Sequence, residues 1–571
     1  MASLIPRSFP LGESLPPNSP HAVSVSLPTW ESVTAWGKRE QWIINKMTTG
    51  YPRFFINTKI RQLSDAVLHR LNVTMPKEIN SMVFVSEASA VRFVETLSMQ
   101  NTDDPHVELI KFFLPKKSGL PLADAYWAAF NVVLYPTGLA KEAAAYWRDT
   151  GDGISTRHAE FCLDRLDYLQ SESTNPTFCT PPIRFTIAET RLATPCSSGV
   201  AERRVLQEFI ADLTSSEQPG QRKVNPESVF LYPRGMSAIY SVMRALASIG
   251  RPSRVVAYGW LYSETIKVIQ RSNGASFTFY GGGTEEELDK LETELAAGKR
   301  IQALFCELPG NPKLLTPDLH RIRKLADKYN FIVLCDETVG TFVNVDILPY
   351  VDIVMSSLTK MFSGYADVMG GSIVLNQQSR YHDLIHSTLA AEYEDTCFPL
   401  DLVALRQNSL DFVQRSHRSN HSGKLVAELL AAHPSVVRLN YPSMGSTAQL
   451  YERYRRRNGG YGHLMSIIFR NQEAASCFYD SLDACKGTSF GTNFTLAIPY
   501  VQLAHYHEQD WVESYGVPRH IVRLSVGLED PGEILKTVAR ALAEVEKIDQ
   551  PVANVVDIKQ PVQVAVESVL S

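Results

Sequence analysis

The chain has 571 residues, a formal net charge of −5 and 44% hydrophobic residues. This length allows two to four domains with a large core, and the composition is ordinary for a soluble globular protein. The small negative charge gives no reason to expect nucleic acid or an anionic membrane as a partner, and no apolar run reaches the ~18 residues that span a bilayer. The eight cysteines lack CxxC spacing and the first residues lack the apolar core of a secretory signal, so we expect reduced thiols, no metal site and a cytoplasmic location.

The amino-terminal third predicts an arm followed by an α+β extension. Residues 1–29 are rich in Pro and Ser, and we expect them to fray as a flexible arm. In residues 30–180, "SMVFVSEASAVRFVETL" is typical of a strand followed by a helix, and "AKEAAAYWRDTG" is typical of a helix. Turn-forming residues in 171–185, "SESTNPTFCTPPIRF", indicate the boundary of the next domain.

Short apolar runs dominate the predicted catalytic domain, residues 181–430. They are "RVVAYG" (254–259), "SFTFYG" (276–281), "IQALFCE" (301–307), "FIVLCDE" (331–337), "VDIVMSS" (351–357) and "GSIVLN" (371–376). Several are separated by helical patterns such as residues 316–330. Runs of this kind are typical of strands buried on both faces of a mostly parallel sheet, so we predict an α/β fold.

The carboxy-terminal part predicts a smaller α+β domain, residues 431–548. Residues 461–470 and 520–530 are typical of strands, and residues 531–547 have apolar residues at helical spacing. We expect the tail, residues 549–571, to be loosely held.

Polar residues follow the predicted strands where a ligand would bind. In open α/β sheets, ligands lie outside the carboxyl ends of the strands. The residues found there are Glu307, Asn311, Asp336, Ser357, Thr359 and Lys360. Gly235 and Met236 begin a helical pattern, and backbone N–H groups at a helix start can bind a phosphate.

Together these residues match the requirements of pyridoxal 5′-phosphate. An aspartate can hold the protonated ring nitrogen, a lysine can form an imine with the aldehyde, and hydroxyl and amide groups can bind the phosphate. Each signal alone has an ordinary structural explanation, because Asp, Ser and Thr at these positions usually cap helices and a lone lysine is usually solvated. The combination in this order favours the cofactor.

Residues 307–376, from "ELPGNP" through "LCDET" and "SSLTKMFSGYADVMGG", resemble the Cys/Met-metabolism family of fold-type I pyridoxal-phosphate enzymes. The resemblance runs from about residue 185 to 547. Further upstream, "HAVSVSLPTWESV", "TGYPRFF" and "YWRDTGDGISTRHAEFC" are similar to the extended fungal type of cystathionine γ-synthase. The resemblance implies a seven-stranded, mostly parallel sheet of the aspartate aminotransferase type, and a homotetramer or homodimer with shared active sites.

The resemblance also implies roles for individual residues. Lys360 would be the Schiff-base lysine, Asp336 the partner of the pyridine nitrogen, and Tyr262 the residue that stacks on the ring and assists proton transfer. Arg523 would grip the substrate α-carboxylate, with Ser489 beside it, although Arg523 alone is more typical of a strand-edge ion pair. The remaining predicted cofactor-binding residues are Gly235, Met236, Asn311, Thr338, Ser357 and Thr359.

One part of the family pattern is missing where we expect it. Family members offer a Tyr-x-Arg pair that reaches the cofactor phosphate from the neighbouring subunit. The corresponding stretch here is "AETRLATP" (188–195), with Leu192 and Thr194 at those positions. Arg191 or Arg234 are candidates for the missing charge, and the departure indicates a specialised relative.

The implied reaction is γ-replacement on an O-acylhomoserine, with the cysteine thiol as the nucleophile. Three alternatives stay open: another sulfur or carbon nucleophile in a specialised biosynthetic pathway, β- or γ-elimination, and a cofactor-binding regulatory or interaction protein without turnover. The substrates are expected to be small amino acids.

Overall fold

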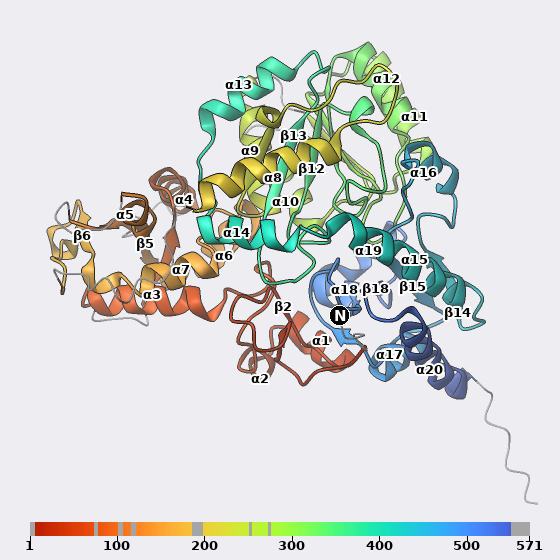
Figure 1. Ribbon diagram of the computed structural model, residues 1–571, viewed down its shortest axis with the longest axis horizontal. Helices are drawn as coiled ribbons and strands as arrows, with labels where there is room; N and C mark the ends of the chain where they lie inside the picture. The colour runs from red at the N-terminus through yellow and green to blue at the C-terminus, as the bar shows by residue number, and fades with distance from the viewer. Residues whose placement is uncertain are drawn as a thin grey trace, which may run out of the picture.

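The computed structural model describes residues 6–73, 78–100, 107–115, 122–184, 198–250, 254–271 and 276–549 (Figure 1). The described residues form four β-sheets, of seven, five, four and two strands. The seven-stranded sheet is central to the fold because the predicted ligand-binding strand ends belong to it.

The six apolar runs all form strands of the seven-stranded sheet. Its order is β7–β13–β12–β11–β10–β8–β9. All strands are parallel except β13, which is antiparallel to both of its neighbours. The strands are β7 (Val229–Tyr232), β8 (Val255–Tyr258), β9 (Phe277–Tyr280), β10 (Ala303–Glu307), β11 (Ile332–Asp336), β12 (Ile353–Ser356) and β13 (Gly371–Leu375). The predicted mostly parallel α/β sheet is therefore confirmed.

Helices cover both faces of this sheet. Along β10, Leu304 and Cys306 pack into one hydrophobic cluster with α8, α11 and α12, whereas Ala303 and Phe305 pack into another with α9, α10 and α13. Because neighbouring strand residues point to opposite faces, continuous apolar runs are what a sheet covered on both sides requires. The helices are α8 (Ser198–Thr214), α9 (Gly235–Ile249), α10 (Ser263–Arg271), α11 (Glu285–Ala296), α12 (Leu319–Tyr329), α13 (His382–Glu392) and α14 (Pro399–Asn408).

The carboxy-terminal part forms the five-stranded sheet, in the order β14–β15–β18–β17–β16. Apolar residues of α15, α17 and α20 pack against this sheet. The elements are α15 (Phe412–Ala431), β14 (Val436–Asn440), α16 (Ala448–Tyr454), β15 (Leu464–Phe469), α17 (Gln472–Ser481), β16 (Cys485–Lys486), β17 (Leu496–Pro499), α18 (Tyr500–Ala504), α19 (Gln509–Ser514), β18 (Val522–Ser525) and α20 (Pro531–Asp549).

A four-stranded antiparallel sheet with its own hydrophobic core lies on the left in Figure 1. Phe398, at the start of α14, joins this core and thereby connects it to the catalytic part. The elements are α3 (Thr58–Arg70), β3 (Ile79–Phe84), α4 (Glu87–Gln100), β4 (Glu108–Phe113), α5 (Leu122–Ala128), β5 (Phe130–Pro136), α6 (Ala140–Thr150), α7 (Thr156–Leu163) and β6 (Gln170–Ser173).

The structure contradicts the expected flexible arm. From residue 6 onward, the segment packs against the carboxy-terminal sheet, where Val25 and Leu27 are fully buried and the backbone N–H of Leu27 donates to the carbonyl of Lys486 (2.9 Å). We expected fraying because Pro and Ser are frequent, but apolar residues between them supply the buried surface. This segment contains β1 (Ser14–Leu15), β2 (Ser24–Val25), α1 (Trp30–Gly37) and α2 (Gln41–Ile44).

Residues 550–571, almost all of the predicted tail, lie outside the described residues. Among the described helices, none is both long and apolar enough to cross a membrane.

Candidate active site

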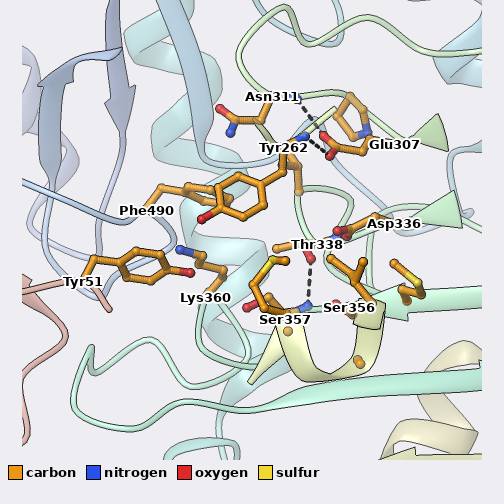
Figure 2. A pocket seen from close by; sticks show the side chains of 17 residues that line it. Tyr51, Tyr262, Glu307, Asn311, Asp336, Thr338, Ser356, Ser357, Lys360 and Phe490 are labelled. Carbon is orange, nitrogen blue, oxygen red and sulfur yellow. Dashed lines mark hydrogen bonds between the residues drawn. The ribbon is translucent and has the colours of Figure 1, made fainter. Parts of the chain in front are cut away.

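A pocket lies at the carboxyl ends of β10, β11 and β12, beside the start of α9. Figure 2 shows Tyr51, Lys360 and Phe490 on one side of it and Asp336 and Glu307 on the other. The predicted site residues that line this pocket are Gly235, Met236, Tyr262, Asn311, Asp336, Thr338, Ser357 and Lys360.

Two carboxylates stand side by side at the strand ends, one buried (Glu307) and one partly buried (Asp336). Glu307 and Asp336 are paired in register on β10 and β11. Burial raises the pKa of Asp336, and burial together with the charge of Asp336 raises the pKa of Glu307 well above its usual value. The Asp336 carboxylate forms no ion pair with another described residue; it accepts a hydrogen bond from the backbone N–H of Thr338 (2.8 Å). A partly buried carboxylate without an ion-pair partner favours a cationic ligand.

Lys360 follows β12 and is almost completely buried, with 6% of its surface exposed. Its Nζ donates a hydrogen bond to the hydroxyl of Ser489 (2.9 Å). Burial, and then the charge of Arg523, lower the pKa of Lys360 well below its usual value, while Asp336 raises it in part. The lowered pKa favours the neutral amine, which is the form that can accept a proton.

The start of α9 provides hydrogen-bond donors facing the pocket. Arg234, the residue that precedes this helix, forms no side-chain cap hydrogen bond with its first backbone N–H groups. A β-carbon added at Gly235 would meet the Ser357 side chain at 3.1 Å, so the helix start and the residue after β12 are in close contact. The backbone N–H of Ser357 donates to the hydroxyl of Thr338 (2.8 Å). Free N–H groups at a helix start, next to a serine hydroxyl, could hold a phosphate.

Glu307 positions the two residues at the upper edge of the pocket in Figure 2. Its carboxyl group accepts the backbone N–H of Tyr262 (2.5 Å) and that of Asn311 (3.2 Å). Burial raises the pKa of the Tyr262 hydroxyl well above its usual value, so this group stays protonated and can act as a donor.

Arg523 lies on β18 next to the pocket and is 6% exposed. Its guanidinium donates to Asn311 Oδ1 (3.1 Å) and to the carbonyl of Ser489 (2.7 Å). Among the described residues, no carboxylate forms an ion pair with Arg523, and burial lowers its pKa to about 10. A buried cation that has hydrogen-bond acceptors but no carboxylate partner could bind a ligand carboxylate through its guanidinium.

The geometry brings Ser489 to the amine and leaves Thr359 away from the pocket. Ser489, at a φ of 79°, contacts Lys360 through its hydroxyl and Arg523 through its carbonyl. The Thr359 hydroxyl instead binds the backbone of Gly370, accepting from its N–H (3.1 Å). We expected the Thr359 hydroxyl at the phosphate, but it stabilises the turn before β13.

The stretch in which we expected the Tyr-x-Arg pair, with Arg191, Leu192 and Thr194, lies outside the described residues. Arg234, the other candidate for the missing charge, donates to the carbonyl of Ile154 (2.9 Å) and its guanidinium lies over the ring of Trp147.

Tyr51 and Phe490 also line the pocket, although no motif in the sequence pointed to either residue. Two residues after Tyr51, the guanidinium of Arg53 forms an ion pair with the fully buried Glu264 (2.7 Å). "YPR" (51–53) is itself a Tyr-x-Arg triplet, but this spacing alone does not indicate where in the fold the segment lies.

These donor and acceptor groups fit pyridoxal 5′-phosphate. Asp336 could bind the protonated ring nitrogen, Lys360 could react with the aldehyde, and the start of α9 with Ser357 could bind the phosphate. The unpaired carboxylate and the uncapped helix start are the two features that such a ligand would satisfy.

Comparison with known proteins identifies the family. Residues 198–543 match the model of the Cys/Met metabolism PLP-dependent enzymes, and residues 59–155 match the amino-terminal domain of fungal trans-sulfuration enzymes. The cystathionine gamma-synthase-like protein ankD of Aspergillus thermomutatus is 47% identical over 540 residues, covering 94% of this chain and 95% of that protein. The cystathionine gamma-synthase of Neurospora crassa is 36% identical, covering 95% of this chain and 99% of its own length.

The fold has solved counterparts as well. The crystal structure of cystathionine gamma synthase from Xanthomonas oryzae pv. oryzae superimposes with a TM-score of 0.52 at 22% identity, covering 66% of this chain and 95% of that one. This likeness confirms the predicted fold. The chain therefore belongs to the family of Cys/Met-metabolism enzymes that depend on pyridoxal 5′-phosphate.

Proposed function

We propose that the protein catalyses γ-replacement on an O-acylhomoserine, with the thiol of cysteine as the nucleophile. One observation carries this proposal: Ser489 contacts both the Lys360 amine and the Arg523 guanidinium. A substrate whose α-carboxylate binds Arg523 therefore has its Cα close to the amine. The names of the relatives from Neurospora crassa and Aspergillus thermomutatus support this reaction class.

Lys360 has the properties of the general base. When bound, pyridoxal 5′-phosphate supplies a ring that withdraws electrons from the substrate carbons next to the amino group. Because the pKa of Lys360 is lowered by burial and by Arg523, its Nζ can take the proton from Cα. Among the described residues, Lys360 is the cation whose charge acts on Asp336, so the Asp336 carboxylate is available to keep the ring nitrogen protonated.

A proton is then removed from Cβ of the substrate. The Lys360 amine and the Tyr262 hydroxyl both line the pocket and are the groups that assist this transfer. Tyr262 stays protonated because its pKa is raised by burial, and it can assist by donating a hydrogen bond. The Cγ–O bond breaks with departure of the acyl carboxylate, and the thiol sulfur bonds to Cγ after losing its proton. The apolar walls formed by Tyr51 and Phe490 limit the access of water to the amine.

Product analysis tests the proposal. The enzyme is incubated with O-acetylhomoserine and with O-succinylhomoserine, each with and without cysteine, and the amino acids formed are separated and identified. Cystathionine that forms only when cysteine is present supports γ-replacement. A keto acid and ammonia at the same rate without cysteine would indicate elimination.

Further outcomes separate the remaining alternatives. A carbon or second sulfur nucleophile that outcompetes cysteine would assign the protein to a specialised pathway. A protein that binds the cofactor but converts none of these substrates would be a binding or regulatory protein, and the proposal would be wrong.

We also propose a homotetramer built from dimers and a cytoplasmic location, both implied by the family resemblance. Light scattering of the purified protein with the cofactor tests the first, and fluorescence imaging of a tagged chain tests the second.

A further inference from the structure

The amino-terminal segment reaches into the catalytic pocket of its own chain. Tyr51 lies more than 300 positions before Lys360 in the sequence, yet the Lys360 Nζ lies over the Tyr51 ring, 4.2 Å from its centroid. The same Nζ lies 4.6 Å from the ring centroid of Phe490. Figure 2 shows the two rings beside the amine, with Tyr51 coming from a different part of the chain than the strand ends.

This position is fixed by contacts on both sides of Tyr51. Before it, the Thr49 hydroxyl donates to the carbonyl of Ala22, and Asn57 Nδ2 donates to the Thr49 hydroxyl (3.1 Å). After it, Arg53 forms its buried ion pair with Glu264 and donates to the carbonyl of Ala504 (2.9 Å). The backbone around Tyr51 is thus tied to three other parts of the structure, so the ring is held at the amine and does not swing freely.

Several charged and titratable groups surround the Lys360 amine. Arg523 disfavours the ammonium form and Asp336 favours it. Glu307, Tyr262 and Tyr51 line the same pocket, and burial raises the pKa of Tyr51 to about 12. Since Tyr51 therefore stays neutral, it can affect the amine through its ring face and not through a negative charge. An aromatic face within about 6 Å attracts an ammonium group.

We propose that Tyr51 is a positioning residue, which uses its ring face, together with that of Phe490, to hold the Lys360 ammonium whenever the amine carries a proton. This role rests on the proposed function, in which Lys360 accepts the proton from Cα. It assigns part of the active site to the amino-terminal segment, residues 6–57, which lies before the region matched by either family model. Burial and Arg523 lower the pKa of Lys360, and the Tyr51 ring opposes part of this lowering. The amine is therefore stabilised in its protonated form between proton transfers.

The test measures the Lys360 amine directly, without turnover. Full-length protein freed of cofactor is labelled briefly with acetic anhydride over a range of pH, and the extent of labelling at Lys360 is measured by peptide mass spectrometry. In Tyr51→Leu, which keeps an apolar side chain but removes the ring, we expect the pKa of Lys360 to fall by roughly 0.5–1 unit. In Tyr51→Phe, which keeps the ring, we expect the wild-type value.

Phe55→Leu is the matched control. Phe55 belongs to the same segment and is buried against Trp36, outside the pocket, so its truncation loosens the segment without touching the amine. An unchanged or raised pKa in Tyr51→Leu would overturn the proposal. So would an equal fall in Phe55→Leu, which would assign the effect to loss of packing, or a fall in Tyr51→Phe, which would assign it to the hydroxyl.

The result is independent of the substrate. If the wild-type protein converts no O-acylhomoserine but the pKa falls in Tyr51→Leu alone, the proposed function fails and the role of Tyr51 stands. If cystathionine is formed but the pKa of Lys360 does not change, only the role of Tyr51 fails.

Discussion

Replacement of Arg523 by glutamine separates a role in substrate binding from a role in stability. The guanidinium is 6% exposed and has an amide and a carbonyl as hydrogen-bond partners, with no carboxylate ion pair among the described residues. In the free protein the buried charge is therefore only partly compensated. Arg523→Gln removes that charge, so we expect the free energy of unfolding to change by no more than about 1 kcal/mol.

The effect on catalysis should be much larger. Loss of one partner of a buried, hydrogen-bonded charge pair costs about 2–5 kcal/mol, so kcat/KM should fall by roughly 30- to 5,000-fold. Most of the loss should appear in KM if the carboxylate is bound equally in the substrate complex and in the transition state.

The assay combines steady-state kinetics with urea unfolding of the same preparations. Arg519→Gln is the control, because Arg519 is 41% exposed and pairs with Glu513 on the surface of the same domain. A kcat/KM within threefold of the wild type in Arg523→Gln would refute the carboxylate role. A loss of several kcal/mol of stability would show instead that Arg523 mainly supports the fold.

Two further predictions concern stability. Among the described residues, Arg53→Leu leaves the fully buried Glu264 with only Lys267 (3.2 Å) and Arg148 (3.6 Å) as cationic partners. Urea unfolding should therefore show a loss of about 2–4 kcal/mol, most of which the double variant with Glu264→Leu should recover; equal losses in both variants would contradict this reasoning. Burial lowers the pKa of His158 to about 4, from about 6.5 in the unfolded chain. The unfolded state therefore binds more protons below about pH 6.5, and the contribution of His158, present above that pH, is lost as the pH falls toward 4. Between about pH 7 and pH 5 the wild type should lose about 2 kcal/mol more than His158→Gln; parallel pH profiles would show that His158 does not titrate in this way.

The residues that local pattern could identify are those at the strand ends. Asp336 and Lys360 each follow an apolar run, and the carboxyl ends of adjacent parallel strands meet at one edge of the sheet. Sequence alone therefore predicted that their side chains lie in one pocket. The strands themselves were predictable because burial on both faces leaves few polar positions within a run.

The direction of β13 and the orientation of Thr359 depend on longer segments of chain. The 14 residues between β12 and β13 contain no helix, so the chain returns antiparallel to β12 and does not cross over the sheet. The Thr359 hydroxyl is used inside this return, where it binds the backbone of Gly370. Neither feature has a local periodicity that would reveal it.

Tyr51 and Arg53 could not be placed from sequence for a different reason. Their contacts are with residues more than 200 positions away, and the surrounding stretch is irregular. The composition of residues 1–29 predicted fraying, whereas the packing of Val25 and Leu27 on the carboxy-terminal sheet is what brings the following residues to the pocket. Such long-range docking depends on complementary surfaces, which single-sequence patterns do not encode.

The central claim is that Lys360 and Asp336 hold one cofactor between them, and borohydride reduction tests it most directly. The protein is loaded with pyridoxal 5′-phosphate, reduced and digested, and the peptide that carries the cofactor is sequenced by mass spectrometry. The account predicts a single labelled residue, Lys360, with weaker cofactor retention in Asp336→Asn. Label on another lysine, or full retention in Asp336→Asn, would contradict it.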